Sequence, residues 1–104
     1  MVYKIVWTRR SQKDLKAIKE YIAQNSIYWS EIITNQLANH VSILSKHPEG
    51  GIPVFPVKFK YLRKLLFKSY RIIYHFSGDD VTIITVHHQS RLVENIPQIK
   101  IYKE

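Results

Sequence analysis

The spacing of hydrophobic and polar residues changes several times along the chain, and each change marks a predicted element. Residues 2–8 are β-branched and aromatic, which predicts a strand. From Arg9 to Gln24 the apolar residues recur every three or four positions, which predicts an amphipathic helix. A second run with this spacing begins near Ser26 or Ser30. It predicts a second helix, which ends before Pro48 because the residue preceding a proline is disfavoured in the helical region.

The second half of the chain predicts strands joined by tight turns. Residues 49–56 hold two glycines and two prolines, which is typical of a loop. Three apolar, β-prone runs follow: Phe59–Phe67, Tyr70–Phe76 and Val81–His88. The connections between them, at residues 68–69 and 77–80, are so short that the three strands should form an antiparallel meander.

The predicted order is β-α-α-β-β-β. This order indicates an α+β domain in which a helical hairpin packs on one face of a largely antiparallel sheet. A chain of 104 residues has the size of one domain, so we expect a single domain over residues 1–104. Residues 92–104 form a C-terminal tail that either adds a short edge strand or docks on the domain.

Arg71 is the first candidate functional residue. It stands in the otherwise apolar run Tyr70–Tyr74, where an unpaired arginine is costly to bury. Strand alternation places Tyr70 and Tyr74 toward the helices and Arg71 on the open face. There we expect it to meet solvent, a partner or an anionic substrate. A surface ion pair with Asp79, Asp80 or a C-terminal carboxylate is the alternative.

The same alternation separates the side chains of the last strand. It groups Ile84 and Val86 with His88, and it groups Thr85 with His87 on the opposite face. The two histidines therefore cannot bind one metal ion together without distortion. Since the chain also has no cysteine, we expect no metal site and no cofactor.

Charge adds a second candidate surface. The formal net charge is +8, which indicates an acidic partner such as nucleic acid, an anionic membrane surface or an acidic protein. No acidic residue occurs between Glu49 and Asp79, and we expect the cations of this stretch to form a target-binding surface. The alternative is a solvated face that keeps the protein soluble. These cations are Lys58, Lys60, Arg63, Lys64, Lys68 and Arg71.

Location can also be predicted from the sequence. The first seven residues are too short and too alternating for a signal peptide. No apolar stretch approaches the ~20 residues that a membrane-spanning helix needs. The absence of cysteine fits a reducing compartment. We therefore expect a cytoplasmic protein with no membrane partner.

Several short segments together resemble the RelE/ParE superfamily, the toxin components of type II toxin–antitoxin systems, which include plasmid-stabilisation proteins. The resemblance covers about residues 5–91. It implies a cytoplasmic growth inhibitor that is neutralised by a cognate antitoxin. The segments are Val6-Trp7-Thr8, Asp14 to Ile22, Leu44, Pro48-Glu49-Gly50, Arg63, Tyr70 to Tyr74, and Val86-His87-His88 with Arg91.

Two target types divide this superfamily. The RelE-like branch enters the ribosome and cleaves mRNA, and the resemblance then implies Arg71 as the residue that stabilises phosphate charge, assisted by His87, His88 or Arg91. The second cationic position of that branch falls on Gln89 here, however. The ParE-like branch poisons DNA gyrase without catalysis of its own.

The long predicted hairpin and the closing Val-x-His with a distal arginine favour the ParE-like branch. A third hypothesis is a non-toxic nucleic-acid or protein-binding module on the same scaffold, because a fold does not fix a function.

Overall fold

The computed structural model describes residues 2–54 and 62–89. Two helices and a five-stranded sheet make up this part of the chain, and the predicted α+β class is confirmed. In chain order the elements are β1 (Lys4–Trp7), α1 (Arg9–Ala23), α2 (Ile27–Val41), the 3-10 turns η1 (Ser42–Ser45) and η2 (Pro48–Gly50), β2 (Ile52–Pro53), β3 (Arg63–Phe67), β4 (Tyr70–Ser77) and β5 (Asp80–His88).

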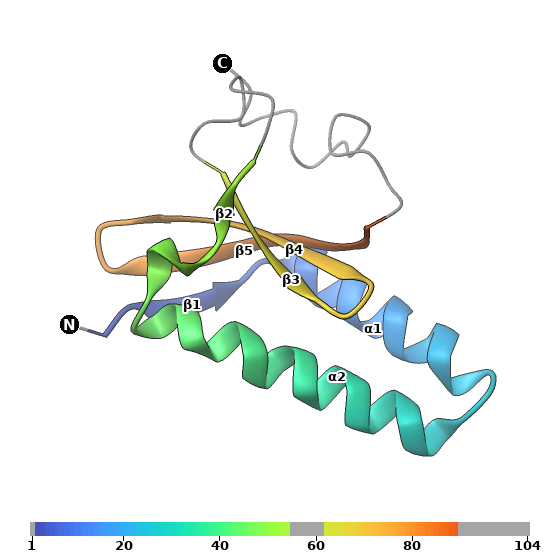
Figure 1. Ribbon diagram of the computed structural model, residues 1–104. Coiled ribbons are helices and arrows are strands. Elements are labelled where there is room, and N and C mark those ends of the chain that lie inside the picture. Colours follow the sequence, from blue (N-terminus) through green and yellow to red (C-terminus); the bar gives the residue numbers. More distant parts are fainter. Residues whose placement is uncertain (1, 55–61, 90–104) are drawn as a thin grey trace.

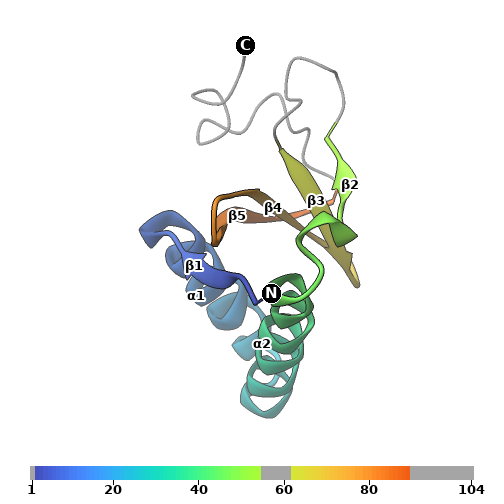
Figure 2. The same ribbon diagram turned by 90° about the vertical axis from the view of Figure 1, so that its left-hand side faces the viewer.

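The sheet has the strand order β1-β5-β4-β3-β2. Strands β3, β4 and β5 form the predicted antiparallel meander, whereas β1 pairs with β5 in parallel. The predicted loop at 49–56 contains the short strand β2, which pairs with β3. Pro53 is compatible with this strand because β2 lies at the edge of the sheet. Both helices lie on one side of the sheet (Figures 1 and 2).

Two of the predictions fall wholly or partly outside the described residues. The run predicted as a strand at Phe59–Phe67 is a strand from Arg63 onward, and its first three residues are not described. The tail at 92–104 is not described either.

The hydrophobic core lies between the helical hairpin and the sheet. Leu37 and Val41 of α2 and Leu44 of η1 pack against side chains from three strands. The strand residues of this core are Leu65, Ile72, Tyr74, Val81, Ile83 and Val86.

A β-bulge corrects one prediction about the last strand. Ile73 pairs with Thr85 and Tyr74 pairs with Ile83, so Ile84 is an extra residue in β5. Ile83 therefore joins Val86 on the helix-facing side, and the predicted grouping of Ile84 with Val86 and His88 was wrong. The bulge leaves Thr85 together with His87 on the opposite face, as predicted.

Thr8 connects the end of β1, the start of α1 and this bulge. Its Oγ1 accepts the backbone N–H of Ser11 at 3.1 Å, which caps the helix. The same hydroxyl lies 2.8 Å from the carbonyl oxygen of Ile83 and 3.1 Å from that of Ile84, so it donates to the bulged segment of β5. One hydroxyl thus stabilises a helix terminus and an irregular strand together.

We expect Thr8→Val to lower the free energy of unfolding by about 2 kcal/mol, the upper part of the range for loss of an N-cap. The matched control is Ser26→Ala, which removes the cap of α2 at an exposed site where the hydroxyl accepts only the N–H of Trp29. Its expected cost is about 1 kcal/mol. Urea denaturation measures both, and equal losses would contradict the second role of Thr8.

Candidate functional site

Arg71 lies in β4, directly opposite His87 of β5. Its neighbour Ile72 belongs to the core, so strand alternation places Arg71 on the face away from the helices, as predicted. The side chain is nevertheless only 8% exposed, and this burial lowers its pKa from the ordinary value. Arg71 is therefore a largely buried arginine rather than one that projects into solvent.

The register of the sheet also bears on the alternative role predicted for Arg71. Asp80 pairs with Ser77, at the far end of β4. Six positions along a strand correspond to roughly 20 Å. A pairing of Arg71 with Asp79 or Asp80 would have to cross that length of sheet, so the structure excludes it.

His87 belongs to a chain of three hydrogen-bonded side chains. Its Nε2 lies 2.6 Å from the hydroxyl oxygen of Thr85, and that hydroxyl lies 2.5 Å from Oδ2 of Asp14. Oδ2 of Asp14 also accepts the backbone N–H of Val86 at 3.1 Å. Thr85 is fully buried and His87 is 8% exposed. We call this set the Asp14–Thr85–His87 chain.

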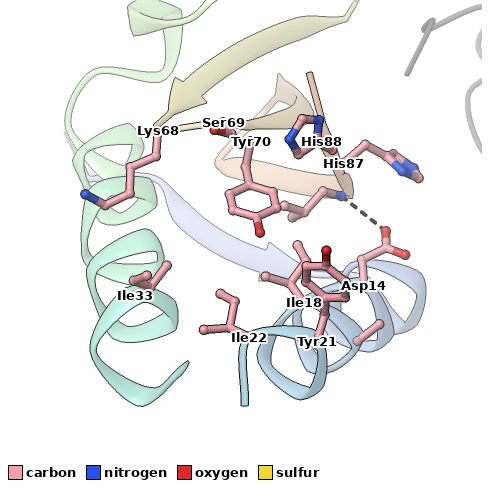
Figure 3. A pocket seen from close by; sticks show the side chains of 12 residues that line it. Asp14, Ile18, Tyr21, Ile22, Ile33, Lys68, Ser69, Tyr70, His87 and His88 are labelled. Atoms are coloured by element: carbon pink, nitrogen blue, oxygen red, sulfur yellow. Dashed lines mark hydrogen bonds between the residues drawn. The ribbon is translucent and has the colours of Figure 1, made fainter. Parts of the chain in front are cut away.

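The position of Asp14 follows from the way β1 leaves the sheet. The pairing of β1 with β5 stops at Trp7 and Ile83, and no other strand of the described residues pairs with the next part of β5 on that side. The carboxylate of Asp14, one turn into α1, takes the place of a strand carbonyl by accepting the N–H of Val86 (Figure 3). Asp14 therefore anchors α1 to the edge of β5.

A groove of about 670 Å³ runs between the helices and the end of the meander. Tyr70 and His88 meet edge to face in it, with ring centroids 5.9 Å apart. Burial and the nearby Tyr21 raise the pKa of Tyr70. Figure 3 shows the Tyr70 hydroxyl pointing toward the helices, and the ring of His87 turned away from that hydroxyl. The two histidine rings therefore point in different directions, although both residues line the groove.

The cations that were predicted to form one target-binding surface have different surroundings in the structure. Arg63 donates to the carbonyl oxygen of Gly51 at 2.8 Å and stacks over the ring of Phe76, so it holds the β2–β3 segment. Lys68 is exposed in the β3–β4 turn at φ +52°, with Nζ over the ring of Phe67. Lys64 is half-buried in β3. Lys58, Lys60 and Arg91 lie outside the described residues.

The sequence analysis gave no functional role to Thr85 or Asp14. It also gave no role to a set of exposed cations on α1. Their helical spacing was the available signal. These cations are Arg9, Arg10, Lys13, Lys16 and Lys19.

In the ranges 2–54 and 62–89, no three histidine, cysteine or acidic residues gather as metal ligands would. Among the helices of the same ranges, none combines the length and apolar character needed to cross a membrane.

Comparison with known proteins identifies the family. A sequence profile for the ParE toxin of the type II toxin–antitoxin system parDE matches residues 5–93. The chain belongs to the ParE toxin family. It is thus the toxin of a type II toxin–antitoxin system, and the predicted membership of the RelE/ParE superfamily is confirmed.

Individual relatives of this ParE-family toxin agree with the assignment. Toxin RelE2 of Caulobacter vibrioides is 32% identical over 89 residues, which cover 85% of this chain and 97% of the relative. The fold matches the chromosomal ParDE toxin–antitoxin system of P. aeruginosa with a TM-score of 0.72 at 18% identity, covering 84% of this chain and 96% of the other. It also matches the RelBE2 complex of Mycobacterium tuberculosis with a TM-score of 0.65 at 18% identity, covering 88% and 95%.

Proposed function

We propose that this ParE-family toxin inhibits growth in the cytoplasm by acting on DNA gyrase and is neutralised by a cognate antitoxin. The observation that carries the proposal is the match of residues 5–93 to the ParE profile. The two 15-residue helices support it, since a long hairpin favours the ParE-like branch. The similar solved structures are of toxin–antitoxin systems, which supports an antitoxin partner.

The role of Gln89 also favours gyrase over mRNA. A RelE-like nuclease carries a second cation at this position, which a neutral amide cannot replace as a source of positive charge. Here the Gln89 amide donates to the carbonyl oxygen of Lys68 at 2.8 Å, and its backbone N–H donates to that of Ser69 at 2.8 Å. Gln89 therefore holds the β3–β4 turn.

A supercoiling assay tests the proposal. Purified toxin should inhibit the supercoiling of relaxed plasmid by gyrase and should trap cleaved DNA, and added antitoxin should reverse both effects. The control is a plasmid reaction with a topoisomerase of another type, which the toxin should leave unaffected. Full supercoiling with no cleaved DNA, at toxin concentrations above that of gyrase, would contradict the proposal.

The second candidate function is ribosome-dependent mRNA cleavage. The observation that favours it is the ordered His87 ring directly opposite Arg71, since general acid–base catalysis on a phosphate needs a positioned imidazole and a cation. Regulated expression with DNA and protein synthesis followed separately distinguishes the two functions. Early loss of DNA synthesis supports gyrase as the target, and early loss of translation with cut mRNA supports cleavage.

A further inference from the structure

We propose that Asp14 and Thr85 are positioning residues for His87, and that growth inhibition by the toxin depends on the ring orientation and tautomer that they impose. The inference rests on the Asp14–Thr85–His87 chain and on the toxin's membership of its family. It holds whether the target is gyrase or mRNA, so failure of the gyrase proposal would leave it standing.

The direction of each hydrogen bond in the chain can be assigned. An ionised carboxylate only accepts, so the Thr85 hydroxyl proton points to Oδ2 of Asp14. A hydroxyl has one proton, and Thr85 can therefore only accept from His87. The 2.6 Å contact between the Thr85 oxygen and Nε2 of His87 then requires a proton on Nε2. The Asp14–Thr85–His87 chain thus excludes the neutral His87 tautomer that carries its proton on Nδ1 alone.

The fold does not need the whole Asp14–Thr85–His87 chain to hold α1 against the edge of β5. The N–H of Val86 is already satisfied by the Asp14 carboxylate, and that bond alone would anchor α1 to β5. A valine at position 85 would fill the same buried volume without a polar group to satisfy. A fully buried threonine hydroxyl costs free energy unless it is bonded, and here its bonds lead from the helix to the imidazole.

The imidazole at the end of the chain lies beside the candidate cation. Arg71 and His87 are paired across β4 and β5, and such opposite residues have Cβ atoms roughly 5 Å apart on one face of the sheet. Asp14 lies on the helix side of the same strand. Asp14, in α1, thereby fixes the orientation of the His87 ring on the opposite face of the sheet. This gives Asp14 a role in toxicity.

Three substitutions test the inference in the full-length toxin. Thr85→Val keeps the shape but removes the hydroxyl, Thr85→Ser keeps the hydroxyl, and Asp14→Asn keeps an acceptor for Val86 while removing the charge. Nitrogen-15 NMR of the His87 ring reports the tautomer, induced growth arrest reports toxicity, and thermal melting reports stability.

We expect protonated Nε2 in the wild type and in Thr85→Ser, with unchanged growth arrest. In Thr85→Val the ring should populate the other tautomer, and toxicity should fall about tenfold, as for one lost hydrogen bond to a charged network. Asp14→Asn should act in the same direction but more weakly, because an amide oxygen accepts the Thr85 hydroxyl less strongly than a carboxylate does. It serves as the second variant should Thr85→Val melt early.

A double-mutant cycle completes the test. His87→Gln should reduce toxicity, and adding Thr85→Val should reduce it no further, because both changes remove the same positioned ring. Unprotonated Nε2 in the wild type, full toxicity in a folded Thr85→Val, or additive losses in the double variant would each overturn the inference.

Discussion

Gly51→Ala is expected to lower the free energy of unfolding by about 3 kcal/mol, combining overpacking with broken hydrogen bonds. A Cβ at this position would lie 2.6 Å from the Tyr74 hydroxyl oxygen and 2.7 Å from the carbonyl oxygen of Lys64. The fully buried Tyr74 accepts the N–H of Gly51 at 2.8 Å and donates to the carbonyl oxygen of Pro48 at 2.6 Å. An added methyl group would displace the hydroxyl and leave these backbone groups unsatisfied.

The neighbouring glycine supplies the matched control for this prediction. A Cβ at Gly50 would meet only the Cβ of His47, at 3.8 Å, so Gly50→Ala should change stability by no more than about 0.5 kcal/mol. Chemical denaturation measures both variants. The double variant Gly51→Ala/Tyr74→Phe should lose less free energy of unfolding than the sum of the two single variants, because the clash and the hydrogen bonds involve the same hydroxyl. Equal effects at positions 50 and 51 would contradict the close approach seen in the structure.

Arg71→Ala is expected to reduce growth inhibition about a hundredfold or more, which corresponds to the loss of roughly 3 kcal/mol of stabilisation of a charged target group. The planar guanidinium offers several donors to a phosphate or carboxylate, and it is placed directly opposite His87. Regulated induction at graded expression levels, with the toxin quantified in each culture, measures this loss.

Arg63→Ala is the control, because the Arg63 guanidinium donates to backbone carbonyl oxygens of Glu49 and Gly51. It should lower the melting temperature and leave toxicity intact in cells grown below that temperature. The reverse result, with Arg63→Ala non-toxic while folded and Arg71→Ala fully toxic, would show that the functional cation is Arg63 in β3 and not Arg71 in β4.

Local patterns were sufficient to predict most of the elements. The helical spacing from Arg9 to Gln24 predicted α1 to within one residue of its end, and the tight turns at residues 68–69 and 77–80 predicted the meander. Strand β2 was missed because Ile52 and Pro53 pair with β3, which lies farther along the sequence. The bulge at Ile84 was missed because its carbonyl contact comes from Thr8, in another part of the sequence.

The candidate site was only partly predictable for the same reason. Alternation gave the correct face for Arg71 and kept Thr85 with His87, because both follow from the period of a strand. It could not give the burial of Arg71, which depends on the rest of the fold. Nor could it connect Asp14 with Thr85, because a separation of 71 positions leaves no periodic signal.

The pairing of the first strand with the last described one has a consequence for the synthesis of the toxin. The hydroxyl of Thr8 bonds a carbonyl 75 residues later, and among the described strands β1 pairs only with β5. Contacts of such long range form late, because the intervening chain must first be closed into a loop. A nascent chain that stops before β5 lacks His87, the strand that pairs with β1, and the core side chains of Val81, Ile83 and Val86. Premature termination before β5 during translation should therefore release an inert polypeptide, and a cell would meet the active toxin only after β5 has been synthesised.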